Sequence, residues 1–485
     1  LSDTSKVMEI KKRFILEEFL YTQILWQRTK KNGFKRGITF HPTGKLTKLM
    51  YEHLPYSLTE AQRRVVKELF SDMSSERQMN RLMQGDVGAG KTIVTLFAML
   101  LAVENGYQAT LLAPTEILAE QHFKTIGDLM SIFPDIHISL LKGGNYKGKK
   151  DILADIASGK SMIIIGTHAL LQKTVVYHKV GLTVVDEQHR FGVQQRAELA
   201  KKNGRPDMLY LSATPIPRSL ALTVYGDLEI SVLDELPPGR KPIKTIWKSE
   251  SKKQLVYEEI KKVLSRKRQI YIVCPLIEDT EKSDLLAAET LYEHLSNNTF
   301  KNYRCAILHG RMKNREKDAT MIAFKNREID ILISTTVIEV GIDVPNASVM
   351  MIEHSERFGL SQLHQLRGRV GRGSDASFCY LISYPPLSKI GAERLRIMTE
   401  TNDGFVIAER DLDLRGPGEF FGTKQSGLPV FKFANIVRDK GILSEAKELA
   451  TRILKADPEL VLPENQLIKD KYETEYRERE SLFKY

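Results

Sequence analysis

Cysteine and long apolar runs are scarce in this sequence. Its three cysteines, Cys274, Cys305 and Cys379, are scattered and lack the spacing of a zinc site or of a disulfide framework. That pattern is typical of a reducing compartment, and we expect each thiol to be a small core residue. No run of 18 apolar residues occurs, and no signal-peptide pattern opens the chain. These absences predict a cytoplasmic protein that does not enter a membrane.

Net charge and chain length indicate the kind of partner and the number of domains. Lysine and arginine total 72 against 61 aspartates and glutamates, which gives a formal net charge of +11 and an isoelectric point of about 9.2. This excess favours an acidic partner such as nucleic acid, although many basic proteins have none. A chain of 485 residues is too long for one hydrophobic core and predicts two or three domains.

The strongest local pattern is a phosphate-binding loop. From Gly85 to Thr92 the sequence is glycine, four residues, then Gly-Lys-Thr. Glycines such as Gly88 and Gly90 let backbone N–H groups converge on a triphosphate without Cβ clashes. Lys91 would bring positive charge to the β- and γ-phosphates, and the Thr92 hydroxyl would bind Mg²⁺.

The segments on either side of this loop support a nucleotide site. A short apolar run, Leu82 and Met83, precedes the loop. The apolar stretch 93–103 after it predicts a buried helix whose N-terminus faces the phosphates. A chance glycine-rich turn is the alternative, and the flanking patterns disfavour it. We therefore predict ATP and Mg²⁺ as the bound groups.

Short apolar runs alternate with helix-length segments, which predicts parallel sheets covered by helices on both faces. The expected strands are 109–113, 162–165, 182–185 and 208–211 in a first unit, and 270–273, 306–308, 331–333, 349–352 and 378–382 in a second. The segment 236–242 between the units predicts a linker. Only the first unit has a phosphate loop, so we expect the nucleotide in the cleft between the two.

Two carboxylates follow the expected strand 182–185. Phosphoryl transfer to water needs a carboxylate that holds Mg²⁺ and a group that orients the water. Asp186 suits the first role and Glu187 the second. Solvated acids at the end of a strand are the alternative, which the preceding phosphate loop disfavours.

Other polar residues are weaker candidates on their own. The amide of Gln62 can pair with the edge of adenine, although an exposed helical glutamine is the simpler interpretation. Ser212 and Thr214 follow an expected strand and could respond to the γ-phosphate, although any turn can hold such residues. Arg369 and Arg372 could reach across the cleft as arginine fingers; a basic loop that binds nucleic acid is the alternative.

Taken in order from Gln62 to Arg372, these stretches resemble superfamily 2 helicases, and the finer match is to the RecG family of bacterial branched-DNA translocases. The matching segments are 166–170, 186–192, 212–218, 308–312, 335–345 and 356–373. A further stretch, 401–427, is similar to the helical-hairpin and loop motif that the RecG family shares with the transcription-repair coupling factor. In detail, segments 237–240 and 416–419 and residue His364 look like the RecG version.

The resemblance implies an α/β fold with two RecA-like parallel-sheet helicase lobes. The implied regions are an N-terminal helical connector (1–50), a first, ATP-binding lobe (51–240), a second lobe (241–390) and a mostly helical C-terminal region with the translocation motif (391–485). The implied activity is ATP-dependent helicase or translocase action on branched DNA, at replication forks and Holliday junctions, in recombination and repair.

The resemblance also implies roles for individual residues. Contacts to nucleic-acid phosphates, which position a strand without reading its bases, would come from Pro114, Thr115, Thr167 and Thr335. Ser212 and Thr214 would serve binding or coupling, and Asp343 would couple the nucleotide to the grip on DNA. Arg394 and Arg415 would link ATP-driven closure to a push on the duplex.

The expected partners are branched duplex DNA and single-stranded DNA-binding protein. The protein itself is expected to be a monomer associated with the nucleoid.

The chain departs from the family pattern in two places. Gly144 replaces an expected serine, and no oligonucleotide-barrel wedge domain precedes the first lobe. The sequence opens on Leu1, so we expect an N-terminal part to be missing. Alternative interpretations are an RNA helicase, a passive branched-DNA-binding module and a phosphate-loop kinase or metabolic ATPase.

Overall fold

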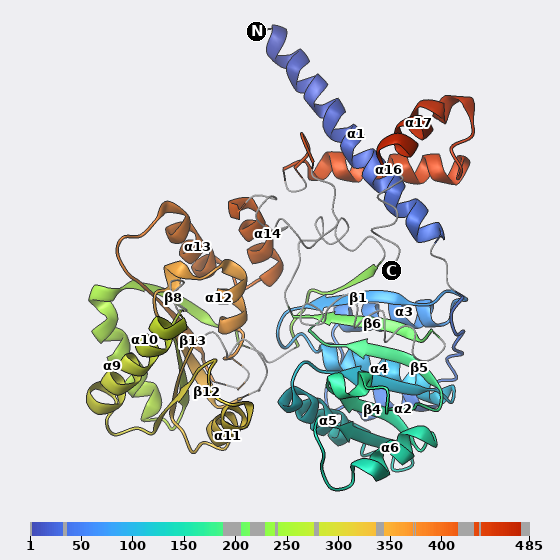
Figure 1. Cartoon of the computed structure of the whole chain (residues 1–485). Helices are drawn as coiled ribbons and strands as arrows, with labels where there is room; N and C mark the ends of the chain where they lie inside the picture. The colour runs from blue at the N-terminus through green and yellow to red at the C-terminus, as the bar shows by residue number, and fades with distance from the viewer. Residues whose placement is uncertain are drawn as a thin grey trace.

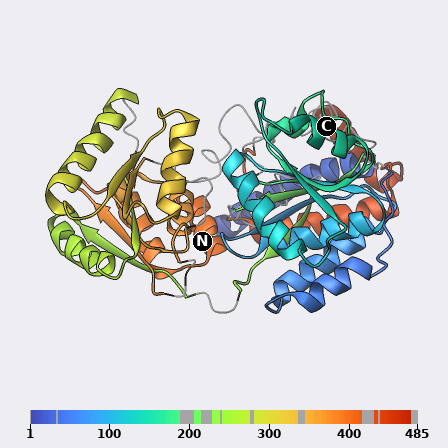
Figure 2. The ribbon, with the colours of Figure 1, turned by 90° about the horizontal axis from the view of Figure 1, so that it is seen from below.

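The computed structural model describes residues 2–32, 36–187, 205–213, 228–237, 241–275, 281–335, 344–371, 373, 375–415, 431–435 and 438–476. These residues form two α/β lobes that lie side by side and a helical unit above the first lobe (Figure 1). Figure 2 shows the same two lobes from below. The two-lobed α/β fold predicted from the sequence is confirmed.

Seven strands of the described residues form the sheet of the first lobe, in the order β3-β4-β2-β5-β6-β1-β7, and every neighbouring pair is parallel. The strands are β1 (Asn80–Gly85), β2 (Gln108–Leu112), β3 (His137–Leu141), β4 (Ser161–Gly166), β5 (Val180–Val185), β6 (Asp207–Ser212) and β7 (Glu229–Leu233). The central strands are buried along their whole length, as their apolar runs predict.

The described α-helices of the first lobe lie on both faces of this sheet. They are α2 (Lys45–His53), α3 (Glu60–Met73), α4 (Lys91–Glu104), α5 (Glu116–Met130) and α6 (Lys149–Ala157). Every residue from Ile93 to Val103 is buried, so the predicted core helix is confirmed in α4. One apolar core joins α3 and α4 to the sheet, and a second core on the opposite face includes Leu82, Ile156 and Tyr210.

The second lobe contains a sheet of six strands among the described residues, in the order β10-β11-β9-β12-β13-β8, again all parallel. The strands are β8 (Lys244–Ser249), β9 (Gln269–Val273), β10 (Cys305–Leu308), β11 (Ile331–Ser334), β12 (Ala347–Ile352) and β13 (Phe378–Ser383). Its described α-helices are α9 (Lys253–Leu264), α10 (Glu281–His294), α11 (Asn314–Lys325), α12 (Leu360–Arg367) and α13 (Lys389–Glu400).

The first and the last of the described helices share one helical unit. Helix α1 (Ser2–Asn32) packs against α16 (Lys440–Ala456) and α17 (Gln466–Glu475), and the three lie together in Figure 1. Ile15 and Phe19 of α1 also share a core with Leu412 of α14 (Gly404–Arg415). The expected connector and C-terminal regions are therefore in contact, while the boundaries given for the four regions stay predictions.

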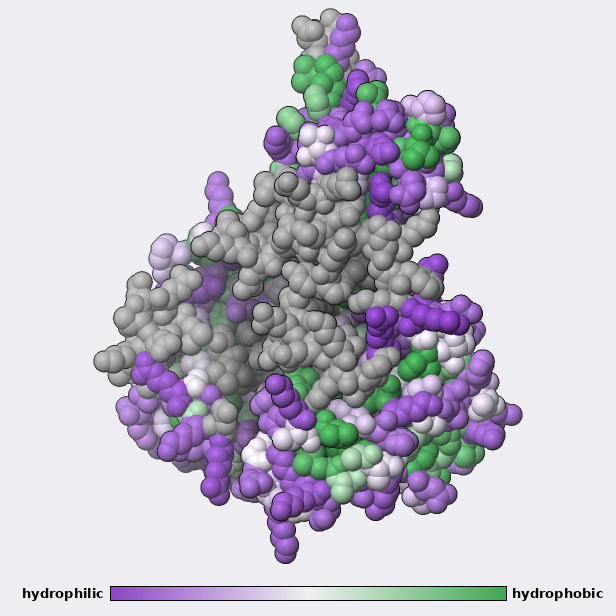
Figure 3. All heavy atoms as spheres, turned by 45° about the vertical axis from the view of Figure 1, so that its right-hand side comes forward, coloured by the Kyte–Doolittle hydropathy of each residue, from purple (hydrophilic) through white to green (hydrophobic). Residues whose placement is uncertain are grey.

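Polar and apolar residues are mixed on the face of the molecule that Figure 3 shows. The first half of α1 leaves several apolar side chains exposed, namely Val7, Met8, Ile10 and Phe14. Among the described helices, none has the length and apolarity that crossing a membrane requires. The three cysteines are free; Cys274 and Cys379 are buried as expected, whereas Cys305 is only partly buried and lies against the core of the second lobe.

Candidate active site

The phosphate loop joins the end of β1 to the start of α4 at the carboxyl edge of the first sheet (Figure 1). Gly88 and Gly90 both have a φ of 83°, in the left-handed region that favours glycine. A Cβ atom on Gly90 would lie 2.2 Å from Nε2 of Gln62, and one on Gly85 would lie 2.9 Å from Cβ of Leu233. Backbone conformation and crowding therefore both require the glycines that the loop pattern predicted.

Lys91 and Thr92 begin α4, so both side chains emerge where the positive end of the helix dipole lies. The ammonium group of Lys91 donates to the backbone oxygens of Gly85, at 2.7 Å, and of Asp86, at 3.0 Å. It also interacts electrostatically with the carboxylates of Asp86 and Asp186. The loop, its lysine and the end of β5 therefore form one cluster, with its cation positioned to meet an anion.

Gln62 lies in the first turn of α3 and is 2% exposed. Its Oε1 accepts the N–H of Thr59 at 2.9 Å, within a capping box, and its Nε2 donates to the carbonyl of Ala89 at 2.9 Å. The structure thus brings Gln62 to the phosphate loop, where its amide fixes the loop to α3. Recognition of adenine by Gln62 stays a prediction.

Asp186 and Glu187 directly follow β5, as the sequence predicted. Oδ2 of Asp186 lies 2.8 Å from Nε2 of His122, and Oδ1 accepts the N–H of Glu187 at 3.0 Å. Burial alone would raise the pKa of Asp186, but the hydrogen bond from His122, the charge of Lys91 and the Glu187 N–H hold that pKa below its usual range. Asp186 is therefore an ionised carboxylate.

Strand order explains why these groups meet. β6 lies between β1 and β5 and is parallel to both, so the three carboxyl ends share one edge of the sheet. Ser212 ends β6 and is buried between the phosphate loop and Asp186. Thr214 lies outside the described residues. Sheet topology thus assembles three motifs that are far apart in the sequence.

The segment 365–371 of the second lobe, which contains Arg369, approaches the phosphate loop. Arg369 follows α12 and is 7% exposed. A Cβ atom on its neighbour Gly368 would lie 3.2 Å from Cβ of Val87 in the loop, so the two lobes are in close contact here. Arg372 and Asp343 lie outside the described residues, and their roles stay predictions.

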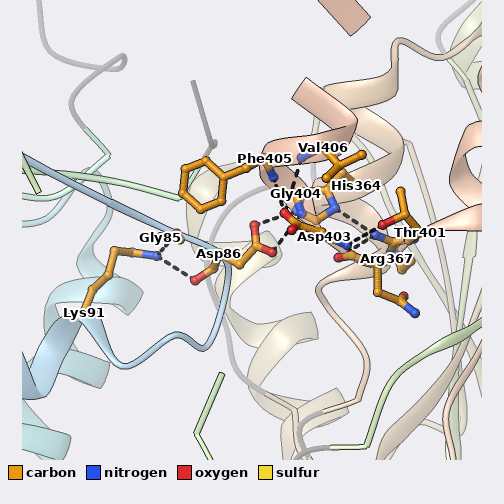
Figure 4. Close-up of polar contacts among 11 residues, drawn as sticks. Gly85, Asp86, Lys91, His364, Arg367, Thr401, Asp403, Gly404, Phe405 and Val406 are labelled. Carbon is orange, nitrogen blue, oxygen red and sulfur yellow. Dashed lines mark hydrogen bonds and ion pairs between the residues drawn. The ribbon is translucent and has the colours of Figure 1, made fainter. Parts of the chain in front are cut away.

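A polar contact also joins the lobes, and the sequence did not predict it (Figure 4). Oδ1 of Asp86 lies 2.8 Å from Nε2 of His364 on α12, and Oδ2 accepts the N–H of Gly404 at 3.2 Å. Burial alone would raise the pKa of Asp86, but the His364 hydrogen bond, the Gly404 N–H and the Lys91 charge lower it. An acidic residue is unusual inside a loop that binds anions, because like charges repel. In the sequence, this unusual residue was the one signal that could have indicated the contact.

The predicted nucleic-acid contacts lie at strand ends of both sheets. Thr115 follows β2, where its hydroxyl caps α5 by accepting the N–H of Leu118 at 3.3 Å. Pro114 precedes it and is half-buried. Thr167 and Thr335 follow β4 and β11, and within the described part of the chain their buried hydroxyl oxygens have no hydrogen-bond partner. Their contacts with DNA stay predictions.

The two arginines assigned to coupling lie on neighbouring helices. Arg394 is half-buried on α13, and its Nε has no hydrogen-bond partner within the described ranges. Arg415 is the last residue of α14, and its side chain lies outside the described residues. The structure therefore places both on the helical hairpin α13–α14 without testing their function.

Three models of protein families match the chain. The DEAD/DEAH box helicase model matches residues 59–223, the helicase conserved C-terminal domain matches 251–374, and the C-terminal part of domain 3 of the ATP-dependent DNA helicase RecG matches 401–479. The RecG helicase of Bacillus subtilis is 46% identical over 464 residues, which cover 95% of this chain and 68% of that protein. The chain belongs to the RecG family.

Other RecG proteins agree with this assignment. The RecG helicase of a Synechocystis species is 48% identical over 94% of this chain and 55% of its own length. A solved structure of RecG bound to a three-way DNA junction is 43% identical, with a TM-score of 0.74, and is matched over 90% of this chain and 57% of that one. The chain thus spans between about half and two thirds of the length of these relatives.

Proposed function

We propose that this chain is the motor of an ATP-dependent DNA helicase that acts on branched DNA, at replication forks and Holliday junctions, in recombination and repair. The observation that supports this most is a contact between the phosphate loop and the second lobe, made by Val87 with Gly368 and by Asp86 with His364. It occurs in a chain of the RecG family. A nucleotide between such lobes would control their closure.

Each part of the site has a proposed role in ATP hydrolysis. The backbone N–H groups of the loop and the ammonium group of Lys91 hold the phosphates, and Gln62 contacts the adenine. Glu187 orients the attacking water. Arg369 and Arg372 stabilise the charge that develops on the transferred phosphoryl group, acting from the second lobe.

The residues present fit a magnesium ion. Asp186 is an ionised carboxylate beside the loop, and a carboxylate has about four lone-pair directions, of which two are used by His122 and Glu187. No group of three or more metal-binding side chains occurs among the described residues, which agrees with an ion held mainly by phosphates and water. Asp186 and the Thr92 hydroxyl would hold it, and Mg²⁺ would neutralise charge on the phosphate oxygens.

Alternating grips on the DNA backbone would convert lobe closure into steps. Pro114, Thr115 and Thr167 would contact phosphates from the first lobe and Thr335 from the second. Arg394 and Arg415 would pass the movement to the duplex through the hairpin. We also propose that the protein works as a monomer in the bacterial cytoplasm, at the nucleoid, with branched duplex DNA and single-stranded DNA-binding protein as partners.

The ATPase rate with four additions tests this function: no nucleic acid, linear duplex DNA, a branched junction and single-stranded RNA. We expect DNA to stimulate turnover strongly and RNA weakly. Equal stimulation by linear and branched DNA would mean that this chain by itself does not select branched DNA. RNA-selective stimulation would instead indicate an RNA helicase, and no turnover with any addition would indicate a passive binding module.

A lysine variant keeps the assay specific. Lys91→Ala should abolish turnover and leave DNA binding intact, because the DNA contacts lie elsewhere. Lys67→Ala, a change on neighbouring helix α3, serves as the matched control and should hydrolyse ATP normally. Retained turnover in Lys91→Ala would overturn the assignment of the phosphate loop.

A further inference from the structure

Asp86 is an acid inside a loop that must hold a highly negative ligand. Two negative groups a few ångströms apart repel each other, most strongly where water is excluded. The side chain of Asp86 is only 19% exposed, so water screens it poorly. Some other contact must therefore offset the repulsion, and that contact indicates what the residue does.

Both carboxylate oxygens of Asp86 point across to the second lobe (Figure 4). Oδ1 accepts from Nε2 of His364 at 2.8 Å, and Oδ2 accepts from the backbone N–H of Gly404 at 3.2 Å. His364 lies on α12, and Gly404 is the first residue of α14. One side chain of the phosphate loop thus contacts both α12 of the second lobe and the first residue of α14.

The imidazole of His364 is fixed in one tautomer. Its Nδ1 lies 3.0 Å from Nη2 of Arg367, and a guanidinium group can only donate hydrogen bonds. Nδ1 therefore accepts, and Nε2 carries the hydrogen that it donates to Asp86. Arg367 is 2% exposed and also donates to carbonyl oxygens of the α13–α14 turn, those of Met398, Thr401 and Asn402.

The two helices that Asp86 contacts are also joined to each other. Ser361 of α12 donates to Asp411 of α14 at 3.0 Å, so the two helices are joined near the contact and again further along. Asp403 caps α14 by accepting the N–H groups of Phe405, at 2.8 Å, and Val406, at 3.3 Å. The carboxylate of Asp86 adds a second negative group at the positive end of the same helix.

On the first lobe, Asp86 belongs to the loop that is expected to bind the phosphates. The backbone carbonyl of Asp86 accepts Nζ of Lys91 at 3.0 Å, while the side chain of the same residue holds α12 and α14. Phosphates in the loop would draw Lys91 away from that carbonyl and place negative charge beside the carboxylate. Asp86 therefore contacts both the lysine expected to hold the phosphates and the first residue of α14.

We propose that Asp86, held by His364, is a positioning residue that transmits the nucleotide state of the phosphate loop directly to helices α12 and α14. This inference rests on the proposed function and deepens it. The route is separate from the arginine at position 369, because it uses a contact made by the loop and not one made by the transferred phosphoryl group.

The coupling can be measured as a ratio of affinities. If the loop and the hairpin are linked, DNA must change the affinity for nucleotide, and nucleotide must change the affinity for DNA by the same factor. The experiment measures the Kd of AMP-PNP, a non-hydrolysable ATP analogue, with and without a junction DNA. The base pairs translocated per ATP hydrolysed, read by displacement of a triplex strand, are measured alongside.

Two substitutions of His364 form a matched pair. His364→Gln keeps a donor near the position of Nε2, within reach of Asp86. His364→Asn keeps an acceptor near Nδ1 for Arg367 but cannot reach Asp86. We expect His364→Asn to reduce the affinity ratio about tenfold, within the usual range of coupling between sites, and to lower the base pairs moved per ATP. His364→Gln should retain most of both.

Two further variants keep the proposal falsifiable. Asp403→Ala weakens the cap of α14 and leaves Asp86 in place, so it should reduce the ratio less than His364→Asn does; an equal reduction would mean that helix stability alone matters. Asp86→Ala removes the same contact from the side of the phosphate loop, and it decides the question if His364→Asn does not fold. An unchanged ratio in a folded variant would overturn the proposal.

The two proposals fail in different ways. If the unmodified chain shows no DNA-stimulated ATP hydrolysis, the proposed function is wrong. If it shows stimulation and a normal coupling ratio that His364→Asn leaves unchanged, only the role of Asp86 is wrong.

Discussion

Nε2 of His122 lies 2.8 Å from Oδ2 of Asp186, and both side chains are nearly buried. The histidine belongs to α5, on the first lobe, so it holds the carboxylate from within the same domain. Groups that orient a metal-binding carboxylate tune both its geometry and its charge. His122 is thus a supporting residue for the magnesium role proposed for Asp186.

We predict that His122→Ala lowers ATP turnover about tenfold to a hundredfold and raises the Mg²⁺ concentration needed for half-maximal rate. The cause is the loss of the hydrogen bond that orients Asp186. A magnesium titration of the DNA-stimulated ATPase measures both effects. His122→Gln retains a donor near Nε2 and should recover most of the rate; if it is as impaired as the alanine variant, the hydrogen bond is not what matters.

Arg369→Ala should reduce the maximal ATPase rate by about a hundredfold or more, while the Kd for AMP-PNP changes little. An arginine finger acts on charge that develops during transfer, so its loss appears in kcat. Arg357, whose side chain is half exposed in the same lobe, provides the control substitution Arg357→Ala. An equal loss of nucleotide affinity in Arg369→Ala would count against the finger role.

Asp207 should make the stability of the first lobe depend on pH. Burial raises its pKa to about 8, although the N–H of Met79 lowers it, and the charge of Asp72 adds to the increase. The unfolded chain loses this proton near pH 4, so between about pH 4 and 8 the native state binds more protons than the unfolded state. Stability contributed by this group is therefore complete below pH 4 and falls as the pH rises through 8.

Asp207→Asn removes that titration. The amide oxygen can still accept the N–H of Met79, which Asp207 now binds at 2.7 Å. We expect the variant to unfold about 2 °C or more above the unmodified chain at pH 8.5, and the difference to shrink towards pH 5. Thermal unfolding at the two pH values measures it. The same difference at both would show that Asp207 does not titrate in this range.

Glu18 of α1 should protect three backbone N–H groups of the segment 431–435. Its carboxylate accepts from Lys432 at 2.8 Å, Phe433 at 3.1 Å and Ala434 at 2.8 Å. We predict that Glu18→Ala speeds hydrogen exchange at these three amides at least about tenfold, since hydrogen bonds to a charged group contribute roughly 1.5 to 3 kcal/mol.

The neighbouring residue is the control for that experiment. Glu17 pairs instead with Lys471, at 2.5 Å, so Glu17→Ala removes an ion pair from the same helix. Its effect should appear near α17 and leave the three amides protected. If both variants expose the amides equally, α1 has loosened as a whole and Glu18 has no specific role.

The interior of both sheets was predictable from the sequence because strands buried on both faces are continuous apolar runs. Strands β3, β7 and β8 were not predicted, and all three lie at an edge of their sheet. Their half-exposed residues alternate with buried ones or remain partly exposed, as in Lys244–Ser249. Each of these three strands has water on one side, so the apolar run that identifies a central strand is absent from it.

The candidate active site was also predictable only in part. Lys91 and Asp186 belong to short motifs whose meaning is local, and the structure brings them to one cluster. The contacts of His122 with Asp186 and of His364 with Asp86 join residues 64 and 278 positions apart. No spacing rule connects such pairs, because strand order and lobe docking create the contact. His364 entered the sequence argument only as part of a family resemblance.

The packing of α1 against α16 and α17 has a consequence during synthesis. Residues 2–32 leave the ribosome before every strand of the two sheets, whereas their partners at 440–475 leave after all of them. Phe19 and Ile24, fully buried in the finished protein, therefore stay without their core while both lobes are being made. An exposed apolar helix on a nascent chain is a site for chaperone binding and for aggregation, so the yield of folded protein depends on how quickly the last helices arrive.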